Sequence, residues 1–129
     1  MQIMPSTGAL LADLRDDEAF MTGDLEDPVL SVGYGIFYLG KLVDRFDGAY
    51  PLAVASYNGG PFNVSAWLRG AGELPMDALV EHIPFRETRR YVRSVTAAYQ
   101  TYVDLYGHPD DRIRLPSPSY GDDPSIVDF

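Results

Sequence analysis

The chain has 129 residues, of which 46% are hydrophobic and 22% charged, and this balance is typical of a single globular domain with a buried core. Ten basic against nineteen acidic residues give a net charge of −9, which argues against nucleic acid and anionic membrane surfaces as partners. The sequence has no cysteine, which excludes disulfides, thiolate metal sites and a cysteine nucleophile but leaves the cellular compartment open.

The spacing of apolar residues in the N-terminal half predicts two helices. Pro5 favours the start of a short helix, which is expected to end in the acidic loop at residues 16–18. Asp27 and Pro28 are a favourable start for a long core helix that ends at Gly48. Its predicted apolar face consists of Val29, Val32, Ile36, Phe37, Leu39, Leu42, Val43 and Phe46.

The second half is also expected to be helical. An alanine-rich helix over residues 50–57 ends at Asn58-Gly59-Gly60, and Pro61 opens another that reaches Leu68. A short helix is predicted over residues 76–81, with a break at Pro84 before a final helix over residues 87–106. One face of that last helix is apolar and rich in tyrosine, with Tyr91, Val92, Val95, Tyr99, Tyr102, Val103 and Tyr106.

These patterns predict an all-α fold over residues 1–107 and a disordered acidic, proline-rich tail over residues 108–129. No transmembrane segment is expected, because glycine and proline interrupt the longest uncharged stretch. The N-terminus also lacks a basic segment followed by an apolar one, so no secretory signal is visible. Either the chain is cytoplasmic or its true start lies upstream of Met1.

The segment ASYNGGP, residues 55–61, is a first candidate site. Tyr57 and Asn58 place a phenol and an amide at a helix end, where they could bind sugar hydroxyls and N-acetyl groups, and the glycines allow a ligand to approach the backbone. In the alternative interpretation, Tyr57 packs on the core and Asn58-Gly59 only ends a helix. On these residues alone the alternative is favoured.

The segment VEHIPFRETRRYV, residues 80–92, is a second candidate. Glu81 could point into a cleft, and Glu87 could stabilise the start of the final helix through its dipole. The alternative, favoured by spacing alone, is a surface on which Arg86, Arg89 and Arg90 neutralise both glutamates. His82 is interpreted as a surface or loop residue, and His108 is assigned to the tail. Neither has a partner at a spacing typical of metal ligands, so no metal is expected.

Together the segments resemble the soluble lytic murein transglycosylase (SLT) family, whose domain has a goose-type lysozyme-like helical fold. Residues 1–7, MQIMPST, resemble the end of the family's Gly-Leu-Met-Gln-hydrophobic-Met-Pro-x-Thr element. Residues 55–61 resemble its Ala-Ala-Tyr-Asn-Ala-Gly-Pro element, and residues 80–92 its Val-Glu-x-Ile-Pro-Phe-x-Glu-Thr-Arg-x-Tyr-Val element. The three occur in the family's order, and Trp67 follows the second as expected.

The resemblance implies cleavage of the β-1,4 bond between N-acetylmuramic acid and N-acetylglucosamine in peptidoglycan, without water and without a cofactor. A single carboxyl group would protonate the leaving oxygen and then take the proton of the muramoyl C6 hydroxyl, leaving a 1,6-anhydromuramoyl end. The implied partner is the glycan strand, and the implied location is the cell envelope or periplasm.

The resemblance also implies which residues bind substrate. Gln2 and Met4 would line the groove near the acid, Tyr57 and Asn58 would hold the reacting sugar, and Glu81 would contact or orient substrate, with Tyr102 a weaker groove candidate. For Met4 and Tyr102, core packing is an equal alternative. The family's catalytic glutamate precedes the first motif, so we expect no catalytic residue in this chain and a domain without its first helix.

Three hypotheses follow. In the first, the chain is part of a transglycosylase whose catalytic helix comes from a longer product or a partner chain. In the second, it is a non-catalytic protein that binds peptidoglycan. In the third, it is a helical interaction domain that recruits a protein through its tyrosine face and acidic tail. Without the first helix, an apolar patch of several hundred Å² would face solvent.

Overall fold

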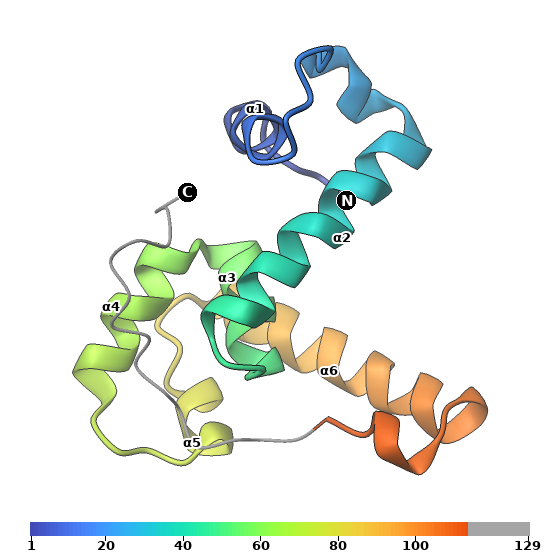
Figure 1. Cartoon of the computed structure of the whole chain (residues 1–129). Helices are drawn as coiled ribbons and strands as arrows, with labels where there is room; N and C mark the ends of the chain where they lie inside the picture. Colours follow the sequence, from blue (N-terminus) through green and yellow to red (C-terminus); the bar gives the residue numbers. More distant parts are fainter. Residues whose placement is uncertain (114–129) are drawn as a thin grey trace. The chain divides into compact units, whose positions relative to one another are not determined.

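Helices make up the regular secondary structure of residues 1–113, the part of the chain that the computed structural model describes (Figure 1). The predicted all-α class is confirmed, because this part contains no β-strand. Two short 3₁₀ turns, η1 (Thr22–Glu26) and η2 (Pro109–Asp111), accompany the α-helices. These helices are α1 (Pro5–Asp13), α2 (Pro28–Arg45), α3 (Tyr50–Gly59), α4 (Pro61–Ala71), α5 (Met76–Glu81) and α6 (Arg86–Tyr106).

Local chemistry sets several of the helix boundaries. Asp27 precedes α2, and its Oδ1 accepts hydrogen bonds from the backbone N–H groups of Val29 at 2.8 Å and Leu30 at 3.1 Å. Glycine with positive φ follows α2 at Gly48 (φ 81°) and α4 at Gly72 (φ 63°), a conformation that other residues rarely adopt. The hydrogen bonds of Asp27 confirm the predicted start of the long helix at Asp27-Pro28.

Contacts divide the chain into two compact units, one spanning residues 1–41 and the other beginning at Leu42, although the sequence suggested one. In the first unit, α1 packs against η1, and Gly8 lies so close to Phe20 and Leu25 that a side chain there would clash with Leu25. Tyr34 is buried, and its hydroxyl donates to the Asp17 carboxylate at 2.6 Å. The aromatic pair Phe20–Tyr34 completes this small cluster, with ring centroids 5.2 Å apart.

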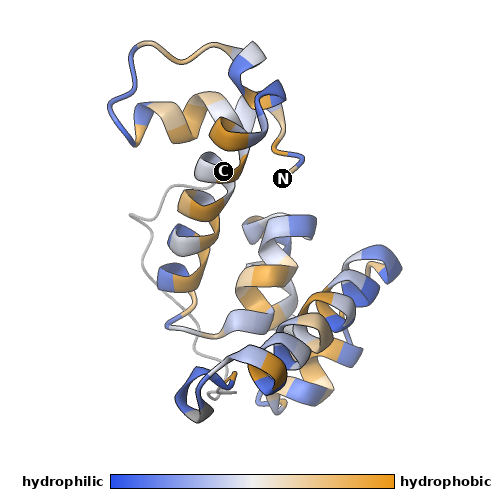
Figure 2. Cartoon of the chain, turned by 90° about the vertical axis from the view of Figure 1, so that its right-hand side faces the viewer, coloured by the Kyte–Doolittle hydropathy of each residue, from blue (hydrophilic) through white to orange (hydrophobic). Residues whose placement is uncertain are grey.

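The predicted core face of α2 is wrong in the N-terminal half of the helix. Val29 is 79% exposed and Ile36 is 64% exposed, whereas Tyr34 is buried. Hydrophobic and hydrophilic residues follow one another along the helices (Figure 2), so hydropathy alone left more than one candidate face. The small first unit covers only the face that carries Tyr34, and the valine and isoleucine side chains extend into solvent.

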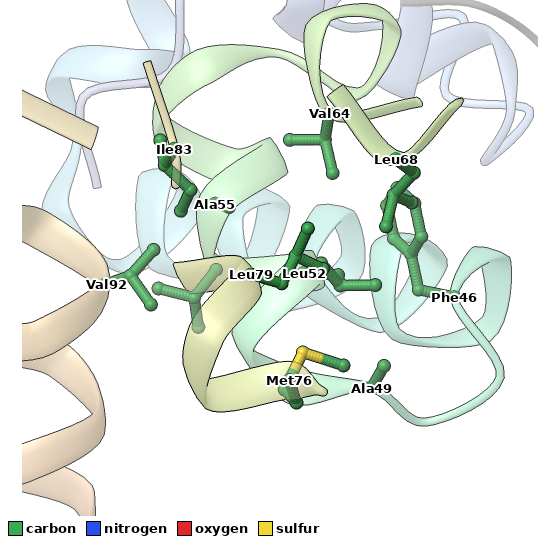
Figure 3. Close-up of a cluster of buried hydrophobic side chains, with 11 residues drawn as sticks. Phe46, Ala49, Leu52, Ala55, Val64, Leu68, Met76, Leu79, Ile83 and Val92 are labelled. Carbon is green, nitrogen blue, oxygen red and sulfur yellow. The ribbon is translucent and has the colours of Figure 1, made fainter. Parts of the chain in front are cut away.

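The second unit contains the main hydrophobic core (Figure 3). Helix α3 is central: it packs against both α4 and α6, and residues 51–56 are all buried. Side chains from the segment just after α2 and from α3, α4, α5 and α6 meet there. The core comprises Phe46, Ala49, Leu52, Val54, Ala55, Val64, Leu68, Met76, Leu79, Ile83 and Val92.

Helix α6 is buried mainly through small side chains. Thr88, Val92 and Val103 are buried, and Tyr91 and Val95 pack partly buried against the core. Tyr102 is 66% exposed and Tyr106 80% exposed, so the predicted tyrosine-rich face is buried only in part. Beyond the helix, residues 108–113 fold back onto α6, where the Tyr99 hydroxyl donates to the Asp111 carbonyl oxygen at 2.8 Å. The rest of the predicted tail, residues 114–129, lies outside the described residues.

Candidate functional site

The junction between α3 and α4 is built around one residue, Gly60. Its φ of 84° lets it end α3 and begin α4 at once, and Pro61 then occupies the first turn of α4 without losing a hydrogen bond. The side chain of Asn63 donates to the Gly59 carbonyl oxygen at 2.8 Å, which satisfies an acceptor that the end of a helix leaves free. The junction therefore holds Tyr57 and Asn58 at a fixed, sharply turned helix end.

Asn58 is held from the side by α6. The Thr88 hydroxyl donates to Oδ1 of Asn58 at 2.7 Å. The NH₂ group of this exposed side chain makes no hydrogen bond among the described residues and can donate to a ligand. Gly59 makes this approach possible: a Cβ at Gly59 would lie 3.0 Å from the Thr88 hydroxyl and 3.3 Å from the Trp67 ring. A side chain at this position would crowd Thr88 and Trp67, which would have to shift by a few tenths of an ångström.

Tyr57 and Ser56 differ in their surroundings although they are neighbours. Tyr57 is half-buried in the last turn of α3, so the residue is accessible in part. Ser56 is fully buried, and its hydroxyl has no hydrogen-bond partner among the described residues. Next to them, Trp67 meets Phe85 edge to face, with ring centroids 5.0 Å apart.

Glu81 ends α5, and its carboxylate is occupied by an arginine of α6. Nε of Arg93 donates to Oε1 at 2.8 Å, and Nη2 of the same residue contacts Oε2. Arg89, one turn earlier, donates from Nη1 to the Glu81 backbone oxygen at 2.9 Å. The expectation of a neutralised glutamate is confirmed for Glu81, but the main partner is Arg93 rather than Arg86, Arg89 or Arg90.

Glu81 lines a depression of about 360 Å³ between α5 and α6. The apolar lining includes Met76, Val80 and Val92, and the polar lining includes Thr96 and Gln100. Asp77, one turn before Glu81 in α5, also lines the depression. A lining that combines apolar side chains with a few polar groups is typical of a site for a partly polar ligand.

The remaining predicted site residues belong to other segments of the chain. Gln2 (φ 55°) and Met4, which is 67% exposed, belong to the segment before α1 in the first unit. Tyr102 lies about 21 Å along α6 from Thr88, where it stacks loosely on Tyr106. The core-packing alternative for Met4 and Tyr102 is wrong, since both side chains are largely exposed.

The structure also locates the remaining charged candidates. Glu87 lies in the first turn of α6, where a negative charge favours the helix dipole. His82 is exposed at the end of α5 and His108 is exposed beyond α6, as predicted. Within residues 1–113, no group of three or more His, Asp or Glu side chains is placed to hold a metal ion, and no helix is long and apolar enough to cross a membrane.

Comparison with known proteins assigns this helical chain to a family. Residues 1–80 match the family model described as the transglycosylase SLT domain. The chain belongs to the SLT transglycosylase family. This SLT chain is 38% identical over 106 residues to the soluble lytic murein transglycosylase of Escherichia coli, and 36% identical over 106 residues to a putative soluble lytic murein transglycosylase of Haemophilus influenzae. These alignments cover 79% and 81% of the chain.

The fold of the SLT chain agrees with this assignment. An X-ray structure of an inactive Glu-to-Gln mutant of the lytic transglycosylase Slt from Pseudomonas aeruginosa superposes with a TM-score of 0.74 at 32% identity, over 88% of this chain. The match covers 20% of that protein, and the chain spans 16% of the Escherichia coli relative and 18% of the Haemophilus one. The all-α, lysozyme-like fold is therefore confirmed.

Two residues of the candidate site were missed by reasoning from sequence. Thr88 was quoted in the third motif but given no role, although it holds Asn58. Arg93 lies one residue beyond that motif, and its contact with Glu81 joins positions twelve apart. The i, i+4 spacing of Arg89 and Arg93 puts both on one helix face, and this was the signal available to find them.

Proposed function

We propose that this SLT chain binds the glycan strands of peptidoglycan as part of a lytic transglycosylase. The enzyme would cleave the β-1,4 bond between N-acetylmuramic acid and N-acetylglucosamine and leave a 1,6-anhydromuramoyl end. One observation carries the proposal: Thr88 fixes the Asn58 amide at the turned end of α3, next to the half-buried Tyr57. A rigid amide beside a phenol suits N-acetyl and hydroxyl groups.

In this proposal each residue has a distinct task. Tyr57 and Asn58 hold the reacting sugar, and Glu81 accepts hydrogen bonds from the strand. Gln2 and Met4 line the groove near the acid, and Tyr102 is a more distant contact. The enzyme would act in the cell envelope or periplasm, where peptidoglycan is found.

We further propose that the proton donor is not one of this chain's five glutamates, which are Glu18, Glu26, Glu73, Glu81 and Glu87. A carboxyl group that must donate a proton near neutral pH needs an apolar surrounding that favours its protonated form. All five side chains are exposed, and Glu81 is also paired with Arg93. A glutamate supplied by a preceding segment or by another chain would take this role.

The test is digestion of purified peptidoglycan, analysed by mass spectrometry for 1,6-anhydromuropeptides. Two proteins are compared: the 129-residue chain, and the same chain extended at its N-terminus by the Glu-Ser segment of an SLT relative. We expect products only from the extended protein, and a Glu-to-Gln change in the added segment serves as the control.

Other results would revise the proposal in specific ways. Products from the 129-residue chain alone would contradict the assignment of the acid, and Glu81→Gln would be the next variant to assay. Binding of glycan without products from either protein would favour a non-catalytic peptidoglycan-binding protein. Failure to bind glycan at all would contradict the proposed function.

A further inference from the structure

We propose that Arg93 is a positioning residue that holds the Glu81 carboxylate ready to accept hydrogen bonds from the glycan strand. The inference rests on the proposed function, in which Glu81 contacts the strand. It adds a residue outside the three sequence motifs, on a different helix from Glu81.

The geometry fixes Glu81 at two levels. Arg93 engages both carboxylate oxygens through Nε and Nη2, the forked arrangement that matches the shape of a carboxylate. Arg89 binds the backbone oxygen of the same residue at 2.9 Å, at the end of α5, where helix carbonyl groups lack internal partners. Side chain and main chain of Glu81 are thus tied to one face of α6.

The pairing leaves Glu81 able to bind a ligand. An ionised carboxylate offers about four lone-pair positions, and Arg93 uses one on each oxygen. The remaining positions can each accept a hydrogen bond from a hydroxyl or an N-acetyl N–H. Glu81 is exposed and lines the depression between α5 and α6, so a ligand there can reach its carboxylate.

Without the Arg93 contact, the Glu81 side chain at the end of the six-residue helix α5 would lose rotamer freedom when it bound a ligand. Arg93 removes that cost in advance, because the carboxylate is already ordered before the ligand arrives. An exposed ion pair adds little to folding stability. The contact should therefore matter more for binding than for the unfolding midpoint, and this difference separates a positioning role from a purely structural one.

The experiment is a double-mutant cycle on the 129-residue chain, measured as the Kd for a (GlcNAc–MurNAc)₂ tetrasaccharide by calorimetry. The variants are Glu81→Gln, Arg93→Gln and the double mutant. Arg90→Gln is the matched control, because Arg90 is exposed on the same helix and has no ion pair or hydrogen bond among the described residues. Arg93→Lys keeps the positive charge but removes the forked pair of N–H donors. It replaces Arg93→Gln as the test variant if Arg93→Gln folds poorly.

We expect Arg93→Gln to weaken binding about tenfold, the size of one charge-assisted hydrogen bond, with the thermal midpoint nearly unchanged. Arg93→Lys should weaken binding by less, and Arg90→Gln should have no effect. Adding Arg93→Gln to Glu81→Gln should cause no further loss, since the effect acts through the Glu81 carboxylate.

Two outcomes would overturn the inference, and they differ from failure of the proposed function. In the first, the fold-changes in Kd of the two single variants multiply in the double mutant. In the second, Arg93→Gln leaves the Kd unchanged while Glu81→Gln raises it. Either result would mean that Arg93 does not position Glu81. If the unmodified chain does not bind the tetrasaccharide, both the proposed function and this inference are wrong.

Discussion

Helix α3 and the N-terminal half of α2 have similarly apolar sequences but very different surroundings. In α3, residues 51–56 are all buried between α4 and α6. In α2, Val29, Val32 and Ile36 remain 79%, 44% and 64% exposed among the described residues. An apolar pattern therefore shows which side chains favour burial, whereas the neighbouring helices decide which of them become buried.

The largest predicted effect comes from truncating one side chain in each helix. Leu52→Ala in α3 should lower the free energy of unfolding by about 3 kcal/mol, because it leaves a cavity in a close-packed core. Ile36→Ala in α2 should change it by less than about 0.5 kcal/mol, since the side chain is already in solvent. Urea denaturation followed by circular dichroism measures both. Equal losses would mean that the exposed face of α2 is covered in solution.

A second pair of variants tests the contact between α3 and α6. Gly59→Ala should destabilise the chain by about 1–3 kcal/mol, because the new Cβ would crowd Thr88 and Trp67. Gly70→Ala in α4 is the control: nothing lies within 4 Å of a Cβ there, and alanine favours a helix over glycine by about 1 kcal/mol. If Gly59→Ala also stabilises the chain, the close approach of α6 to α3 is not present.

The first unit should respond to pH through Tyr34. Burial, followed by the hydrogen bond to Asp17 and the charge of that carboxylate, raises the pKa of Tyr34 to about 12 from 10.0. The unfolded chain therefore ionises this phenol first, so its contribution to stability is complete below pH 10 and is lost as the pH rises from 10 to 12. In thermal melts over this range, the wild-type midpoint should fall more steeply than that of Tyr34→Phe. Parallel curves would contradict the burial of Tyr34.

The smallest predicted effect has the opposite sign. Ser56→Ala should leave stability unchanged or raise it by up to about 1 kcal/mol, because the described residues give the buried Ser56 hydroxyl no partner. Ala55→Gly, at the preceding buried position, provides a destabilising reference. Should Ser56→Ala destabilise the chain by 1 kcal/mol or more, the hydroxyl has a partner in solution.

Much of the fold could be predicted because its signals are local. Asp27 and Pro28 mark the start of α2, Gly60 and Pro61 mark the junction of α3 and α4, and Pro84 separates α5 from α6. These residues act on their own segment of backbone, so their effects can be deduced from the sequence. The division into two units depends on contacts between segments, and no local pattern indicated it.

The candidate site shows the same limit. The third motif indicated Glu81 and the arginines that follow it as site candidates. The spacing of these charges did not identify which arginine pairs with Glu81. That choice depends on how α5 meets α6, and it places Arg93 on Glu81 while leaving Arg90 in solvent. In the same way, the bond from Thr88 to Asn58 joins residues thirty positions apart and follows only from the packing of α3 on α6.

If the proposed function is correct, a glycan strand binds where α3 and α5 end. This can be tested by a two-dimensional NMR titration of the 129-residue chain with the (GlcNAc–MurNAc)₂ tetrasaccharide. We expect the side-chain amide of Asn58 and the backbone amides of residues 57–60 and 81 to shift together and to saturate at one Kd. Shifts confined to the exposed tyrosines around Tyr102 and Tyr106, or no shifts at all, would contradict it.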